Sequence, residues 1–86
     1  MADQPATKPP PALTRRQRAI LRFVVDHVAR HDFPPVIREI QGALGISSTS
    51  VVTHHLGVLQ DLGLIRRTPH VSRSIVVLPA GHEALR

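Results

Sequence analysis

Residues 46–59, ISSTSVVTHHLGVL, carry several hydrogen-bonding side chains but no Lys, Arg, Asp or Glu. At helical spacing, one face of this segment is short or polar and consists of Ser50, Thr53, His54 and Gly57. Hydroxyl and imidazole groups can exchange hydrogen bonds with base edges, and a threonine methyl can contact the methyl group of thymine. The pattern therefore predicts a face suited to the major groove of DNA, although a weakly polar face exposed to solvent would have the same composition.

The other face of the same segment is apolar. Its centre consists of Val52, Leu56, Leu59 and Gly63. Its edges consist of Val51, His55, Val58 and Leu62. On the polar face, Gly57 lowers helix propensity by about 1 kcal/mol relative to alanine. A glycine there is useful where something must approach the helix closely, as a DNA backbone would.

Positive charge is concentrated outside that segment. The formal net charge is +5, and residues 13–79 account for all of it with nine arginines against four acidic residues. A planar guanidinium suits phosphate oxygens, so a basic folded unit of this kind predicts contact with nucleic acid, while a solvated basic surface is the alternative. The candidate phosphate contacts are Arg15, Arg38, Arg66, Arg67, His70, Ser72 and Arg73.

The first expected helix covers about residues 14–31. It begins at a capping box, in which Thr14 and Gln17 exchange side-chain and backbone hydrogen bonds. It ends ahead of Pro34 and Pro35, because the residue before a proline avoids helical conformation. Apolar residues recur along it at helical spacing, which predicts one buried face.

Two further helices are expected on either side of a glycine. The first covers residues 36–44 and is followed by Gly45, which is typical of a left-handed helix cap. Ser47 or Ser48 caps the second, which extends to about residue 62. Two helices joined by a tight turn of this kind are typical of a helix-turn-helix.

The period changes after the third helix. Residues 64–68 and 74–78 are rich in β-branched side chains and predict a hairpin with the loop 69–73. The predicted fold is mostly α with a small β-hairpin: a winged helix-turn-helix of three helices plus a two-stranded antiparallel wing. Residues 13–79 form this domain, between a disordered proline-rich arm at 1–12 and a C-terminal tail at 80–86.

Other classes of function receive little support from the sequence. The chain has no cysteine, and the His27 and His31 pair supplies only two of the three or four ligands that a metal site needs. No nucleophile lies beside a base, and no phosphate-binding glycine loop is present. We therefore expect no enzyme, metal, cofactor or small-molecule substrate. The absence of a signal pattern and of a membrane-length apolar run predicts a cytoplasmic protein.

Residues 13–78 resemble the N-terminal DNA-binding domain of the LexA family of SOS-response repressors. The similar pieces, in order, are the opening LT-x-R-Q, Asp26-His27, Pro34-Pro35, Glu39-Ile40, Leu44-Gly45, Ser48, His55-Leu56, Leu59, Gly63, Ile65 and Ser72-Arg73. Each piece is weak alone, but the order and spacing are specific. The resemblance implies a winged helix-turn-helix, which agrees with the elements expected above.

The resemblance also implies which residues contact bases. By position these are Ser48, Ser50, Val51, Thr53 and His54. Of these only Ser48 keeps the family residue, since the family has Asn and Ala at the next two positions and acidic residues at the last two. The mode of docking is therefore expected to be shared and the target sequence to differ. Val36 also replaces a family threonine that caps the second helix, a change worth about 1 kcal/mol.

LexA repressors carry a C-terminal serine–lysine peptidase domain that dimerises and cleaves its own linker at an Ala-Gly bond. This chain has Ala80-Gly81 near the linker position and reaches Arg86, so neither activity is expected of these residues. A single module is expected to bind DNA weakly unless two copies form a weak dimer on paired half-sites, about one helical turn apart. The sequence fits either part of a longer protein or a free-standing regulator.

Two hypotheses follow from the sequence. In the first, the chain is a sequence-specific regulator of double-stranded DNA, expected to be a repressor, with helix 48–62 in the major groove and wing 64–78 on the backbone. In the second, the winged helix is a protein-interaction module, such as an anti-repressor or assembly adaptor, whose valine-rich third helix docks on a partner.

Overall fold

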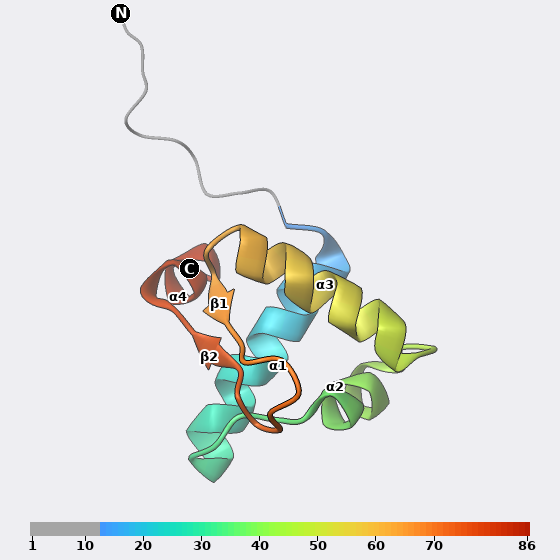
Figure 1. Cartoon of the computed structure of the whole chain (residues 1–86). Coiled ribbons are helices and arrows are strands. Elements are labelled where there is room, and N and C mark those ends of the chain that lie inside the picture. The colour runs from blue at the N-terminus through green and yellow to red at the C-terminus, as the bar shows by residue number, and fades with distance from the viewer. Residues whose placement is uncertain (1–12) are drawn as a thin grey trace, which may run out of the picture.

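The computed structural model describes residues 13–86. Its elements follow the order α1 (Arg15–His31), α2 (Ile37–Leu44), α3 (Thr49–Asp61), β1 (Ile65–Arg66), β2 (Val76–Val77) and α4 (Pro79–Ala84) (Figure 1). This mostly helical arrangement with a two-stranded antiparallel hairpin confirms the predicted class, a winged helix-turn-helix. The predicted proline-rich arm lies outside the described residues.

The first helix begins as the sequence predicts. The Thr14 hydroxyl accepts a hydrogen bond from the Gln17 amide at 3.0 Å, and the Gln17 side-chain oxygen accepts one from the Thr14 amide at 3.1 Å. Both amides would otherwise lack partners at the start of a helix. At the other end, Asp32 adopts a left-handed conformation with φ of 64°, and the chain then enters the Pro34-Pro35 link.

The turn between α2 and α3 also follows its predicted caps. Gly45 ends α2 with φ of 64°, a conformation that a residue without a Cβ adopts readily. Ser48 starts α3, where its hydroxyl accepts a hydrogen bond from the Val51 amide at 3.3 Å. Val36 has no side-chain acceptor to cap α2, so only the reciprocal half of a capping box is present, in which the Glu39 carboxylate accepts a hydrogen bond from the Val36 amide at 2.8 Å.

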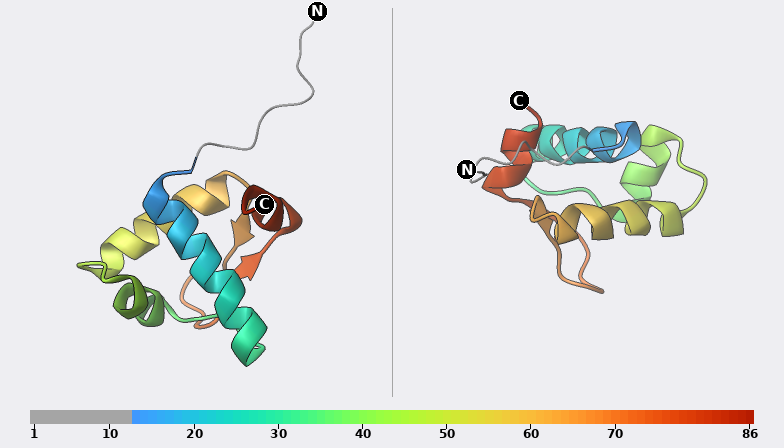
Figure 2. Two further views of the ribbon diagram at one scale, coloured as in Figure 1. Left: turned by 180° about the vertical axis from the view of Figure 1, so that it is seen from behind. Right: turned by 90° about the horizontal axis from the view of Figure 1, so that it is seen from above.

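The core lies between α1 and α3. Seen from above, these helices form two layers, with α2 closing one end and the hairpin and α4 closing the other (Figure 2). The buried apolar side chains come from all of these elements and are Ile20, Leu21, Val24, Ile40, Ile46, Val52, Leu56, Leu59, Leu64, Ile65, Ile75 and Ala84. Burying one face of α3 here leaves its opposite face to solvent. Within residues 13–86, no helix is long and apolar enough to cross a membrane.

The hairpin is shorter than the sequence predicts. Only two residue pairs form the ladder, Ile65 with Val77 and Arg66 with Val76, so the predicted five-residue strands are wrong in extent. Side-chain bonds close the long loop 67–75 in place of further ladder bonds. The Ser74 hydroxyl accepts from the Thr68 amide at 3.1 Å and lies 3.0 Å from the Thr68 carbonyl.

The expected C-terminal tail at 80–86 is wrong, because residues 79–84 form the helix α4. Within the described residues the chain therefore has four helices and not three. Gly81 and Ala84 are buried, and a Cβ added at Gly81 would collide with the Leu64 carbonyl oxygen. A six-residue helix has little stability of its own, so packing creates it and the sequence pattern does not reveal it.

Candidate nucleic-acid interface

The exposed face of α3 presents the predicted polar stripe. Ser50, Thr53 and His54 are exposed, and Thr49 in the first turn joins them. The Thr53 hydroxyl donates its proton to the Thr49 carbonyl at 2.9 Å. Because Thr53 is exposed, its hydroxyl oxygen can still accept a hydrogen bond from a base, and its methyl group can contact a thymine methyl.

The two other predicted base contacts have internal roles. Ser48 is half-buried and its oxygen caps α3. Val51 is also half-buried and packs against the core cluster. Both remain at the start of α3, where a recognition helix approaches bases most closely, but neither presents the free polar group that Ser50 and His54 present.

Gly57 has no packing role within the described part of the chain. A Cβ added at this position would meet no atom within 4 Å, and its backbone is helical. The fold therefore tolerates alanine here, and the core gives no reason for the glycine. That the benefit of Gly57 concerns an approach from outside stays a prediction.

His55 joins α3 to the start of α1. Its Nδ1 lies 3.3 Å from the Gln17 side-chain nitrogen. Since the Gln17 oxygen accepts from the Thr14 amide, this nitrogen is the donor and His55 Nδ1 is the acceptor, which requires the neutral ring. Burial lowers the pKa of His55 below its ordinary value, and the nearby charges of His54 and Arg16 lower it further.

Arg38 lies beside the start of α3. It lines a shallow hollow over the turn between α2 and α3, together with Gln41, Gly42, Gly45, Ile46, Ser48 and Thr49. Sequence reasoning selected Arg38 for its charge but missed Gln41 and Thr49. The sequence could have identified both residues. Gln41 lies one helical turn after Arg38, and Thr49 directly follows the Ser48 cap.

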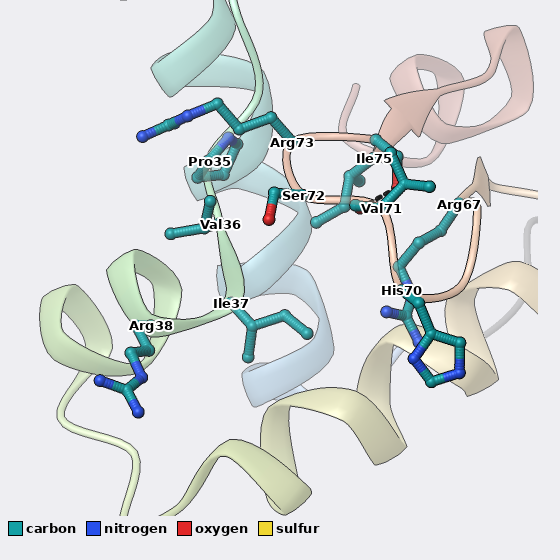
Figure 3. A pocket seen from close by; sticks show the side chains of 11 residues that line it. Pro35, Val36, Ile37, Arg38, Arg67, His70, Val71, Ser72, Arg73 and Ile75 are labelled. Atoms are coloured by element: carbon teal, nitrogen blue, oxygen red, sulfur yellow. Dashed lines mark hydrogen bonds between the residues drawn. The ribbon is translucent and has the colours of Figure 1, made fainter.

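A second hollow separates α2 from the wing. Arg38 stands on its α2 side, while Arg67 and His70 project from the wing (Figure 3). Ser72 also lines it, and its apolar wall includes Ile37, Val71 and Ile75. The structure therefore brings together Arg38, Arg67, His70 and Ser72 from two separate segments, and Arg38 borders both hollows.

The remaining predicted phosphate contacts are distributed differently. Arg66 is exposed on β1, the first strand of the wing. Arg15 lies at the start of α1, in a depression shared with Arg16, Ala19, Leu44 and Ile46, and so it borders the turn between α2 and α3. Arg73 already has an ionic partner, since its two terminal nitrogens lie 3.0 and 3.3 Å from the two carboxylate oxygens of Glu39.

The histidine pair on α1 has local partners. The His27 and His31 rings lie 4.4 Å apart between centroids, and His27 Nδ1 lies 2.9 Å from the Phe33 carbonyl oxygen. Among residues 13–86, no group of three or more His, Cys, Asp or Glu side chains is placed to hold a metal ion.

The turn-linked helices, the uncharged exposed face on the second of them and the adjacent basic hairpin define a winged helix-turn-helix of the nucleic-acid-binding class. A sequence profile described as the LexA DNA binding domain matches residues 11–74. The chain is also similar to proteins named LexA repressor. It is 46% identical over 69 residues to that of Parafrankia sp. (strain EAN1pec), which covers 80% of this chain and 28% of the relative.

Other relatives give the same result. The identity is 46% over 71 residues with the LexA repressor of Ligilactobacillus salivarius (strain UCC118), covering 83% of this chain and 34% of the relative. It is 51% over 65 residues with that of Roseiflexus sp. (strain RS-1), covering 76% and 30%. The chain belongs to the LexA DNA-binding domain family. It spans about a third of the length of these relatives.

Proposed function

We propose that this chain is a sequence-specific, double-stranded DNA-binding repressor of the LexA type, acting in an SOS-like response. Family membership and the name shared by the relatives support this proposal. The observation that carries it is the position of one uncharged, hydrogen-bonding helix face beside arginines on α2 and the wing. Base contacts specify a sequence and phosphate contacts position the protein, and the two regions have the matching chemistry.

In this proposal α3 enters the major groove. Ser50, Thr53 and His54 contact base edges, and Ser48 and Val51 lie at the start of the helix, where the groove floor is nearest. His54 can donate from one ring nitrogen and accept at the other, whereas Thr53 acts as an acceptor because its proton is already donated. This donor and acceptor set differs from the family residues given above, so we expect an operator that differs from that of other LexA repressors.

Phosphate contacts surround the helix on two sides. Arg38 on α2 and Arg15 at the start of α1 border the turn between α2 and α3, while Arg66, Arg67, His70 and Ser72 lie on the wing. A DNA backbone along each side of the groove would meet one of these groups. The small area of a single module makes paired half-sites the expected arrangement, with two copies about one helical turn apart or a multiple of it.

In vitro selection from random duplexes tests the proposal. We expect enriched sequences that contain a motif, repeated at a fixed half-site spacing, with an affinity that falls steeply as salt rises. If no sequence is enriched, the chain has no salt-dependent affinity for DNA and a protein partner co-purifies in stoichiometric amount, the chain is a protein-interaction module and not a DNA-binding repressor. Enrichment without a repeated half-site would retain DNA binding and reject the paired arrangement.

A further inference from the structure

The wing is tied to the start of α2 by Arg73. One terminal nitrogen of its guanidinium donates to the Pro34 carbonyl and to Glu39 Oε1, each at 3.0 Å. The other donates to Glu39 Oε2 at 3.3 Å, and the guanidinium carbon lies 4.6 Å from the centre of the Phe33 ring. Phe33 and Pro34 belong to the link between α1 and α2, and Glu39 lies in the first turn of α2, so all three are far from the wing in sequence. We call Arg73, Glu39, Pro34 and Phe33 the wing clamp.

Glu39 serves both sides of the clamp. Its Oε1 accepts from the Val36 amide at 2.8 Å and from Arg73, so one carboxylate fixes the start of α2 and the wing together. The Val36 amide and the Arg73 guanidinium lower the pKa of Glu39, which keeps it ionised. His27 Nε2 lies 3.7 Å from the same oxygen and adds a contact from α1.

The backbone of Arg73 is unusual. Its φ is 56°, in the left-handed region that side chains with a Cβ disfavour. A glycine would adopt this conformation at lower cost. His70 in the same loop shares this conformation, with φ of 64°. At Arg73 the bidentate ion pair, the carbonyl bond and the contact with the Phe33 ring offset its cost.

The wing needs such a tie because its own ladder is short. Two-residue strands form a hairpin that has little stability without outside contacts. Arg67, His70 and Ser72 all lie on the loop that this hairpin carries, so their positions relative to α3 depend on what fixes the loop. A loop that is already ordered loses less conformational entropy when it binds.

We propose that Arg73 is a positioning residue for DNA binding, which acts through Glu39 to fix the wing against α2 and does not use its charge on a phosphate. This proposal rests on the proposed function. This role differs from the predicted phosphate contact of Arg73, because the two predict opposite effects of Glu39 on DNA affinity. If Arg73 binds phosphate, Glu39 competes with DNA for it; if Arg73 is a positioning residue, Glu39 helps DNA to bind.

Glu39→Gln separates these alternatives. The glutamine oxygen can still accept from the Val36 amide, so α2 keeps its start, while the ionic half of the clamp is lost. A positioning role predicts roughly 3- to 10-fold weaker binding to the selected duplex, even though the change removes a negative charge. Glu83→Gln on α4, where the carboxylate pairs with Arg86, is the matched charge control and should bind as the wild type or slightly more tightly.

Wing order is measured on the same proteins. Backbone NMR relaxation of the full chain should show faster motion of residues 67–74 in Glu39→Gln than in Glu83→Gln. Arg73→Lys, which keeps the charge and loses the bidentate geometry, should weaken binding without changing the slope of affinity against salt.

Three results would overturn the inference. They are Glu39→Gln binding as tightly as the wild type, an ordered wing in that variant, or an Arg73→Lys protein with wild-type affinity. These outcomes are distinct from a failure of the proposed function, in which the wild type itself binds no duplex. In that case the clamp has no role in binding, and the relaxation data alone report whether it orders the wing.

Discussion

The exposed face of α3 and the wing lie on the same side of the molecule but are built in opposite ways (Figure 2). The α3 face is uncharged and is held by buried Val52, Leu56 and Leu59 directly beneath it. The wing is basic and rests on a short ladder, with side-chain bonds from Ser74 and Arg73 fixing its loop. Rigid packing suits donors and acceptors that must match base edges within a narrow geometry, whereas phosphate contacts are less directional and need the wing loop to be held beside α3, which a few side-chain bonds can do.

Loss of a buried side chain beneath α3 should cause the largest change, a loss of folding stability. Leu56→Ala deletes a side chain that is 1% exposed, and we expect the free energy of unfolding to fall by about 2–5 kcal/mol. Leu62→Ala is the matched control, because Leu62 is 39% exposed at the end of the same helix. Chemical denaturation of both variants measures the difference. Equal losses would show that α3 does not depend on the core as described.

Sequence preference should depend on α3. Thr53→Ala removes an exposed acceptor and a methyl group, and we expect the free energy that separates the selected operator from its best single-base variant to fall by about 1–3 kcal/mol. DNA titrations with both duplexes measure it, and an unchanged difference would contradict base contact by Thr53.

The wing should affect overall affinity and not sequence preference. Arg67→Ala should weaken binding to all duplexes alike and reduce the slope of log affinity against log salt concentration by about 0.9. Arg18→Ala, exposed on α1 in the opposite layer, is the control for lost charge. A changed sequence preference in Arg67→Ala would contradict the assignment of base contacts to α3 and phosphate contacts to the wing.

Gly57→Ala tests how closely DNA approaches α3. Because the added Cβ meets no atom within 4 Å, we expect the free energy of unfolding to rise by about 1 kcal/mol. The affinity of the same variant for DNA should fall if the DNA backbone passes close to residue 57. Denaturation and a DNA titration measure the two effects on one protein. A variant that is more stable and binds normally would reject the close approach.

The smallest expected effect concerns pH. The pKa of His55 is lowered in the fold, so the unfolded chain binds more protons as pH falls through its ordinary value of about 6.5. Stability should therefore decrease between pH 7.5 and 5.5, a window above the titration of Glu39. His55→Gln should reduce this decrease relative to the wild type, whereas His54→Gln should retain most of it. Denaturation at both pH values checks this, and an unchanged pH dependence in His55→Gln would contradict it.

Several features of the fold were predictable because they depend on local chemistry. The Thr14 and Gln17 capping box, the left-handed Gly45 and the Ser48 cap each satisfy backbone groups within a few residues. The polar stripe of α3 was predictable because helical period alone decides which residues share a face. The site assignments themselves remain proposals, and the structure adds Thr49 and Gln41 to the candidates.

By itself, the sequence determined the approximate boundaries of α1, α2 and α3, the turn and the chemistry of the two faces of α3, since neighbouring residues decide all of these. Only the tertiary structure decided that residues 79–84 form a helix, that the ladder is short and that Arg73 pairs with Glu39. These three depend on contacts between segments distant in sequence. Short elements have too little internal hydrogen bonding to form alone, so long-range packing decides their structure.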